Sequence, residues 1–281
     1  TPLTTQKSKY QNKLTAWTSL ASKLSTLQTA TDNLKDSSDL SLYKASLTSP
    51  SSTSADSLLS VTTSTGATTG NYSIQVNHLA KSQKIQSDSV SSQDTDAGWT
   101  GSITLEGHEI TLDGKSLLTL RNEINALNSG TGASGVSATI LKTTDSDYRL
   151  ILTHDATGAT GMSLTDDAAG HYFSIEDPEN PGTYILDTLQ AGIDAEFSID
   201  GITMTRSSNT ISDAISGLTL TLKSEDPATT VTLDVTRDTD AVKAKIQTFV
   251  DAYNQVLDYY DQQMTYDATN SKAGGALFGD N

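Results

Sequence analysis

The two ends of the chain carry heptad-spaced positions, whereas the segment between them is patterned for strands and turns. Near the N-terminus the stripe positions follow one another at spacings of three and four: Tyr10, Leu14, Trp17, Leu20, Leu24, Leu27, Thr31 and Leu34. Near the C-terminus the same spacing holds for Val242, Ile246, Phe249, Tyr253, Val256 and Tyr260. Such spacing places each set along one face of a helix. Each stripe is too narrow to form a core alone, so we expect the two ends to pair as antiparallel helices.

Eight of these side chains are expected to form the contact between the helices: Tyr10, Leu14, Trp17, Leu24, Leu27, Ile246, Phe249 and Tyr253. We therefore predict an α+β multidomain fold, in which an antiparallel helical coiled-coil domain from both termini holds two nested β-rich domains, each a sheet with a short helix. The predicted boundaries are 1–46 and 238–281 for the helical domain, 47–92 and 191–237 for the inner β-rich domain, and 93–190 for the outer β-rich domain inserted in the inner one.

Polar residues mark where the two long helices end and begin. The first helix is expected over residues 6–36, where the run Asp36-Ser-Ser-Asp39 ends it. The second is expected to begin at the N-cap cluster Asp238-Thr-Asp240. Residues 47–69 are rich in Ser and Thr, and we expect them to be extended and to pair at a sheet edge.

A hairpin, a short helix and a returning strand occur twice in the middle of the chain, at residues 103–140 and 197–222. In each copy an acidic residue followed by Gly107 or Gly201 separates two strands, where a two-residue turn requires positive φ. This interpretation predicts a helix at 117–127, an irregular segment at 170–190 and a helix at 211–215.

Composition limits the classes of function. The formal net charge is -16, and Lys and Arg form no stripe, so we expect no nucleic-acid partner. No segment approaches the roughly 20 apolar residues that a spanning helix needs, so we expect no membrane insertion. The chain has no cysteine, which excludes disulfides and thiolate metal sites. An aromatic content of only 6% suits a structural protein better than an enzyme with a deep pocket.

The segment Gly130-Thr-Gly132-Ala-Ser-Gly135 matches a dinucleotide-binding fingerprint by its letters. That motif works only when a strand precedes the glycines and a helix follows them. Here the order is reversed, so we interpret the segment as a helix C-terminus and a loop. The four histidines lack ligand spacing, and no nucleophile has a base beside it. We therefore predict no catalytic, cofactor-binding or metal-binding residues, no cofactor and no enzymatic activity.

Subunit contacts are the feature that sequence determines least. Trp99 lies in a polar stretch at a predicted domain boundary, and exposed aromatic side chains often anchor interfaces. We predict Trp99 as a possible subunit-interface residue, and a local anchor within the fold is the alternative that stays open.

Several segments, in the same order, resemble the bacterial flagellar filament cap (FliD) family of hook-associated proteins: 70–80, 120–126, 135–140, 148–153, 207–215, 218–222 and 249–254. The resemblance spans nearly the whole chain. It implies a structural cap at the distal tip of the flagellum, outside the cell, which promotes the folding and polymerisation of flagellin and prevents loss of monomers. It further implies a ring-shaped homo-oligomer whose partners are flagellin and the filament tip, and contacts in a ring are head-to-tail.

Two alternatives remain open at this stage. The Arg-Asn-Glu-Ile-Asn segment at 121–125 is also similar to a short repeat of hook and filament proteins, so another axial component, such as a hook or hook-filament junction protein, is possible. The Ser/Thr-rich β segments leave a secreted adhesin as a third interpretation.

Overall fold

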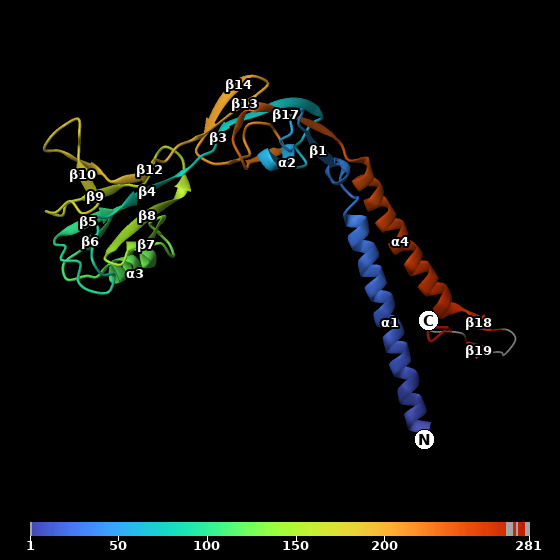
Figure 1. Ribbon diagram of the computed structural model, residues 1–281. Coiled ribbons are helices and arrows are strands. Elements are labelled where there is room, and N and C mark those ends of the chain that lie inside the picture. The colour runs from blue at the N-terminus through green and yellow to red at the C-terminus, as the bar shows by residue number, and fades with distance from the viewer. Residues whose placement is uncertain (1, 268–271, 274, 279–281) are drawn as a thin grey trace. The chain divides into compact units, whose positions relative to one another are not determined.

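The chain folds into two compact units in the computed structural model, which describes residues 2–267, 272–273 and 275–278 (Figure 1). The helical unit comprises Thr1–Ala45, Thr63–Gly70 and Val235–Asn281. The β-rich unit comprises Ser46–Thr62 and Asn71–Asp234. The protein is thus a mixed α/β protein with several antiparallel sheets.

Helices dominate the first unit and are short in the second. In the described residues the helices are α1 (Pro2–Asp32), the 3₁₀ helix η1 (Ser37–Leu40), α2 (Ala55–Leu58), α3 (Leu117–Leu127) and α4 (Thr239–Met264). The predicted long helices and the helix at 117–127 are confirmed, and the first helix ends four residues earlier than predicted. Asp238 caps α4, because its Oδ1 accepts a hydrogen bond from the Ala241 amide at 2.9 Å.

The described strands form six small sheets. The largest has the order β1 (Tyr43–Thr48), β17 (Asp226–Arg237), β3 (Gly70–His78), β13 (Ala195–Ile199) and β14 (Ile202–Arg206). A four-stranded sheet has the order β12 (Thr188–Gln190), β4 (Ser82–Gln86), β8 (Asp147–Thr157) and β7 (Val136–Thr144). One three-stranded sheet has the order β15 (Thr210–Ile211), β16 (Leu218–Leu222) and β2 (Leu59–Thr63). The other has the order β6 (His108–Thr111), β5 (Ser102–Leu105) and β9 (Leu164–Asp166). Two ribbons are β10 (Ser174–Glu176) with β11 (Tyr184–Leu186) and β18 (Tyr266–Asp267) with β19 (Lys272–Ala273).

Both predicted hairpin turns are confirmed. Leu105 pairs with His108 across the first turn, and Ile199 pairs with Ile202 across the second, so each loop has two residues. The first turn has φ of 49° at Glu106 and 80° at Gly107, and the second turn repeats these values closely. Positive φ at both central positions defines a type I′ turn, which twists in the sense that the flanking strands require.

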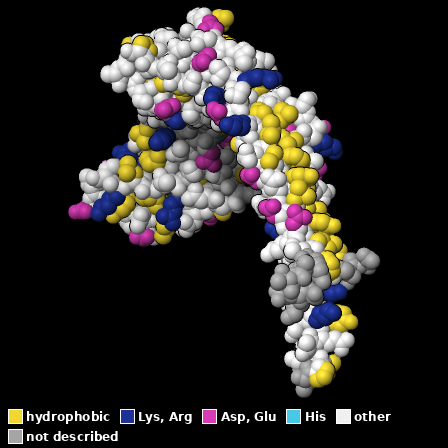
Figure 2. All heavy atoms as spheres, turned by 90° about the vertical axis from the view of Figure 1, so that its right-hand side faces the viewer, with side chains coloured by type: hydrophobic (Ala, Val, Ile, Leu, Met, Phe, Trp, Pro, Cys, Tyr) yellow, Lys and Arg dark blue, Asp and Glu magenta, His cyan; other side chains and the backbone are white. Residues whose placement is uncertain are grey.

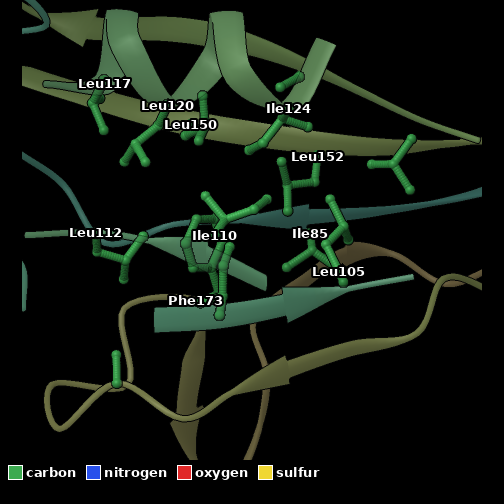
Figure 3. Packing of buried hydrophobic residues seen from close by; sticks show 14 of the residues in the cluster. Ile85, Leu105, Ile110, Leu112, Leu117, Leu120, Ile124, Leu150, Leu152 and Phe173 are labelled. Carbon is green, nitrogen blue, oxygen red and sulfur yellow. The ribbon is translucent and has the colours of Figure 1, made fainter. Parts of the chain in front are cut away.

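A hydrophobic core lies between α3 and the strands around it (Figure 3). Leu117, Leu120 and Ile124 project from one face of α3, at the spacing of three and four residues, toward Leu150 and Leu152 of β8. All five side chains are fully buried. Ser116 caps this helix, since its hydroxyl accepts a hydrogen bond from the Thr119 amide at 3.2 Å.

The helix predicted at 211–215 is wrong. β15 occupies Thr210–Ile211, and bends and a turn follow up to β16. Local hydrogen bonds explain this outcome: Asn209 is bound through its side-chain amide to both backbone groups of Ala80, and Asp213 pairs with the Arg206 guanidinium at 3.0 Å. A five-residue helix is too short to compete with such anchors.

The irregular segment predicted at 170–190 is also wrong, because it contains β10, β11 and β12. The Pro-containing run at 177–182 is the loop of the β10–β11 hairpin, closed by a bond from the Asp177 amide to the Thr183 carbonyl at 2.8 Å. Turn residues were therefore mistaken for the absence of strands.

One other prediction is confirmed, and another is confirmed in part. The three glycines at 130–135 lie in the loop between the end of α3 and the start of β7, each with positive φ, as expected for a helix C-terminus rather than a dinucleotide site. The Ser/Thr-rich segment at 47–69 is extended only in part: β2 lies within it at the edge of a sheet and the edge strand β1 ends at Thr48, whereas α2 occupies Ala55–Leu58.

Candidate functional site on the helix pair

The helical unit is built on α1 and α4, which lie side by side and run in opposite directions (Figure 1). One stripe on each helix is buried or half-buried, and we call these two stripes the inner seam. On α1 the inner seam consists of Lys13, Ala16, Leu20, Lys23, Leu27 and Ala30. On α4 it consists of Val242, Lys245, Phe249, Ala252, Val256 and Tyr259. Both sets follow the heptad alternation of three and four residues, which keeps two helices in contact along their length.

Small side chains occupy the most buried positions of the inner seam. Ala16 and Ala252 are 5% and 3% exposed, the most deeply buried seam positions apart from Ala30. The distance between packed helices depends on the side chains at the contact, so alanines allow a near approach. Two contacts across the seam involve Tyr259. Its hydroxyl donates a hydrogen bond to the Ala16 carbonyl at 3.1 Å, and the Lys23 Nζ lies 5.5 Å from the centre of its ring. These contacts fix the register of the pair.

Charge favours the antiparallel orientation. The first 24 residues hold four lysines and no acidic residue, whereas residues 246–264 hold three aspartates and no lysine or arginine. Lysines near a helix N-terminus are disfavoured by the helix dipole. In the antiparallel pair, however, the basic half of α1 runs beside the acidic half of α4. At the other end, the Lys245 ammonium donates to the Asp39 carbonyl of η1 at 2.7 Å.

A second stripe on each helix is exposed, and we call these the outer stripes. On α1 the outer stripe contains Leu3 (77% exposed), Tyr10 (63%), Leu14 (68%), Trp17 (50%) and Leu24 (47%). On α4 it contains Ile246 (46%), Val250 (39%), Tyr253 (47%), Leu257 (42%) and Tyr260 (49%). The α4 positions follow an unbroken four-three-four-three spacing, which is the pattern of a face that packs against another helix.

The two outer stripes lie on the same side of the helix pair. Each is displaced by one residue from the inner seam, as Trp17 follows Ala16 and Tyr253 follows Ala252. One residue turns a helix by about 100° in a fixed sense. Because the helices are antiparallel, these two rotations bring both outer stripes to the same side of the pair. In a parallel pair the two stripes would lie on opposite sides. The result is a single apolar face across both helices, and Figure 2 shows a band of hydrophobic side chains along this part of the chain.

The structure corrects the predicted helix-pair contact. Six of the eight predicted residues belong to the outer stripes and retain 46 to 68% of their exposure: Tyr10, Leu14, Trp17, Leu24, Ile246 and Tyr253. Only Leu27 and Phe249 lie in the inner seam, where they are half-buried. The prediction took large side chains to occupy the centre of the contact, whereas the most buried seam positions are the alanines Ala16, Ala30 and Ala252. Val250 and Leu257 were missed, although their spacing from Ile246 could have identified them.

Trp99 is not at the surface, which corrects the prediction of an interface residue. Its side chain is 4% exposed, stacks on Tyr172 with 5.1 Å between ring centres, and meets Phe173 edge-on at 5.7 Å. It belongs to the core around α3 and is therefore an anchor within the fold.

The described residues contain no group of three or more His, Asp or Glu side chains placed to hold a metal ion. None of the described helices is both long and apolar enough to span a bilayer. The outer stripes expose apolar side chains at heptad spacing, which is the pattern of helices that pack against other helices. The chain thus belongs to the class of α/β proteins with a helix pair that is apolar on a second, exposed side.

Models of protein families match both ends of the chain. The model of the flagellar hook-associated protein 2 N-terminus matches residues 1–83, and the model of the C-terminus of the same protein matches residues 192–281. The chain belongs to the flagellar hook-associated protein 2 family.

Curated relatives agree with this assignment. Flagellar hook-associated protein 2 of Escherichia coli (strain K12) is 31% identical over 100% of this chain and 61% of the relative. The B-type flagellar hook-associated protein 2 of Pseudomonas aeruginosa is 29% identical over 95% of this chain and 59% of the relative. The chain thus spans about three fifths of the length of these relatives.

Solved structures share the fold. The D1-D2-D3 domains of the flagellar cap protein FliD from Escherichia coli match with a TM-score of 0.73 and 28% identity, over 95% of this chain and 73% of that chain. FliD from Pseudomonas aeruginosa PAO1 matches with a TM-score of 0.58 and 28% identity, over 75% of this chain and 99% of that chain.

Proposed function

We propose that this chain is part of a structural cap at the distal tip of the bacterial flagellum, outside the cell. The cap promotes the folding and polymerisation of flagellin and prevents the loss of monomers, and it does so by binding, without catalysis or a cofactor. The proposal is supported by family membership and by relatives that are flagellar cap proteins.

The observation that carries the proposal is the apolar face of the helix pair. Ten large hydrophobic side chains on α1 and α4 are between 39 and 77% exposed, all on one side. A helix pair that is apolar on a second side is normally covered by further helices. We propose that helices from the remainder of the full-length protein and from neighbouring subunits cover this face.

The finer architecture belongs to the same proposal. The helix pair acts as an antiparallel coiled-coil domain of residues 1–46 and 238–281. An inner β-rich domain of 47–92 and 191–237 carries an outer β-rich domain of 93–190 as a nested insertion. The first segment of the helical unit ends at Ala45 and its last begins at Val235, close to the proposed bounds, although the unit also includes Thr63–Gly70. The subunits form a ring by head-to-tail contacts, in which different patches meet.

Complementation of a strain that lacks the native gene tests this function. The full-length protein should restore filaments, whereas the full-length variant with Leu14→Ser, Tyr253→Ser and Leu257→Ser should leave flagellin in the medium as monomer. The matched control is Leu141→Ser, since Leu141 is also 50% exposed but lies on β7 of the β-rich unit. Monomer secretion by cells that carry the unaltered protein would overturn the proposal.

Imaging separates the cap from the alternatives. A labelled cap protein marks the filament tip, whereas a hook or hook-filament junction protein marks the filament base. A secreted adhesin would instead bind glycan or mucin through its β segments and would not be needed for filament growth.

A further inference from the structure

A cleft in the β-rich unit is not used by the proposed function. It has a volume of about 940 Å³ and is open to solvent. Its walls come from β9, from the β10–β11 ribbon and from the segment that leads into β12: Leu164, Asp166, His171, Ile175, Tyr184 and Asp187 among others. This volume is at the upper end of the range typical of ligand sites, about 300 to 1,000 Å³.

The cleft is bordered by strand edges. Among the described strands, β9 ends the order β6-β5-β9, and β10 and β11 pair only with each other. A two-stranded ribbon is marginally stable without a partner. Strand edges with unpaired backbone groups are the places where extended polypeptides add to a sheet. The border therefore suits an extended chain better than a helix.

Apolar side chains on the ribbon are exposed. Ile175 and Ile185 lie directly opposite each other across the two strands, so they share one face, and each is 45% exposed. Tyr184 is 49% exposed and stacks on His171 with 3.7 Å between ring centres. His171 has φ of 50°, which is unusual for a residue other than glycine. This stack holds a flat aromatic surface at the cleft.

The charge of the cleft is negative. Asp166 and Asp187 are among the residues that line it, and no lysine or arginine is. The Oδ1 atom of Asp166 is buried without a hydrogen-bond partner among the described residues. Nearby, partial burial raises the pKa of Asp88, and the carboxylates of Asp187 and Asp166 add to that rise while Arg149 opposes it. Crowded carboxylates beside an aromatic ring favour a cationic ligand.

We propose that this cleft binds an extended segment of another protein in which lysine or arginine alternates with apolar residues. The strand edges pair with its backbone, Ile175 and Ile185 contact its apolar side chains, and the carboxylates with Tyr184 bind its cationic side chains. A β-strand has a period of two, so alternate side chains of such a segment reach the two kinds of surface.

Fluorescence anisotropy with labelled ten-residue peptides tests the proposal on the 281-residue chain. A peptide that alternates Lys with Val should bind, and one that alternates Glu with Val should not. Ile185→Ser and Asp187→Asn, both changes of cleft-lining residues, should each weaken binding of the Lys/Val peptide at least threefold. The controls are Leu141→Ser for the loss of an exposed apolar side chain and Glu109→Gln for the loss of an exposed charge.

Three outcomes would overturn the proposal. The Lys/Val peptide would fail to bind, or the controls would weaken binding as much as the cleft variants, which would indicate only the general negative charge of the chain. Alternatively, the chain would self-associate in sedimentation without binding the peptide, and the cleft variants would abolish that association, which would assign the cleft to a second copy. Circular dichroism spectra that match the unaltered protein should accompany each variant.

Discussion

At the scale of single residues, alanine occupies the three most buried positions of the inner seam, Ala16, Ala30 and Ala252. Larger side chains such as Leu27 and Phe249 lie between them in the seam and are half-buried. Sequence spacing alone could not separate the inner seam from the outer stripes, because both have the same heptad period and differ by one position.

A larger side chain in the inner seam should therefore lower the free energy of unfolding, whereas the same substitution at an exposed position of the helix should not. Ala16→Leu adds three carbons at a site that is 5% exposed, so we expect a loss of about 1 to 3 kcal/mol in the free energy of unfolding. Ala21→Leu is the matched control, because Ala21 is exposed on the same helix, and we expect a change within about 0.5 kcal/mol. Urea unfolding followed by circular dichroism measures both. Equal costs would contradict the assignment of the seam.

Truncation of the two tryptophans should lower the free energy of unfolding by very different amounts. Trp99 is 4% exposed and packed between rings, so Trp99→Ala should lower the free energy of unfolding by about 3 to 5 kcal/mol. Trp17 is 50% exposed, and Trp17→Ala should cost less than about 1 kcal/mol. Urea unfolding measures both variants. A loss of less than about 1 kcal/mol for Trp99→Ala would contradict its role as an anchor within the core and would again favour an interface role.

The pKa of Asp213 tests the structure of residues 211–215, where the sequence predicted a helix and the structure has none. The Arg206 guanidinium bonds Asp213 and lowers the pKa of that carboxyl below its ordinary value of 3.8. Because the folded-state pKa is depressed, the ion pair stabilises the fold above the ordinary pKa and loses this effect as the pH falls below it. Arg206→Gln should move the Asp213 pKa back toward 3.8 in a carbon-detected NMR titration. An unchanged pKa would contradict the ion pair that replaces the predicted helix.

At the scale of elements, a helix or hairpin could be predicted from the sequence where its capping or turn residues agreed with its hydrophobic spacing. The α3 helix has its Ser116 cap, its Leu117-Leu120-Ile124 spacing and a glycine-containing loop after it, and it lies where predicted. The type I′ turns were equally readable from Glu106-Gly107 and Asp200-Gly201. By contrast, β10 and β11 are three residues each, too short for alternation to distinguish them from a loop.

The stability of α4 depends on its N-cap, in which Asp238 Oδ1 accepts the hydrogen bond of the Ala241 amide. Asp238→Ala removes the acceptor for the Ala241 amide and should cost about 1 kcal/mol, within a range of roughly 0.5 to 2 kcal/mol. Asp238→Asn keeps a side-chain oxygen and should restore most of the loss, so it serves as the control. Thermal unfolding by circular dichroism compares the three proteins. Equal midpoints for Ala and Asn would indicate that charge, rather than the cap, is responsible.

At the scale of the whole molecule, the net charge belongs to one unit. The β-rich unit holds 24 acidic and 8 basic residues, whereas the helical unit holds 10 of each. The formal charge of -16 is thus carried by the β-rich unit, while the apolar face lies on the neutral helical unit. Any assembly of copies brings the charged units nearer to one another, so hydrophobic contact has to act against their repulsion.

Self-association should therefore strengthen with salt. The screening length falls from about 30 Å at 0.01 M ionic strength to about 8 Å at 0.15 M, which weakens repulsion between the β-rich units. Hydrophobic contact between outer stripes is not weakened by this change, so the dissociation constant should fall several-fold in sedimentation equilibrium. The triple variant Leu14→Ser, Tyr253→Ser and Leu257→Ser should remain monomeric at both ionic strengths. Association that weakens with salt would instead indicate ion pairs between unlike patches and would contradict assembly through the apolar face.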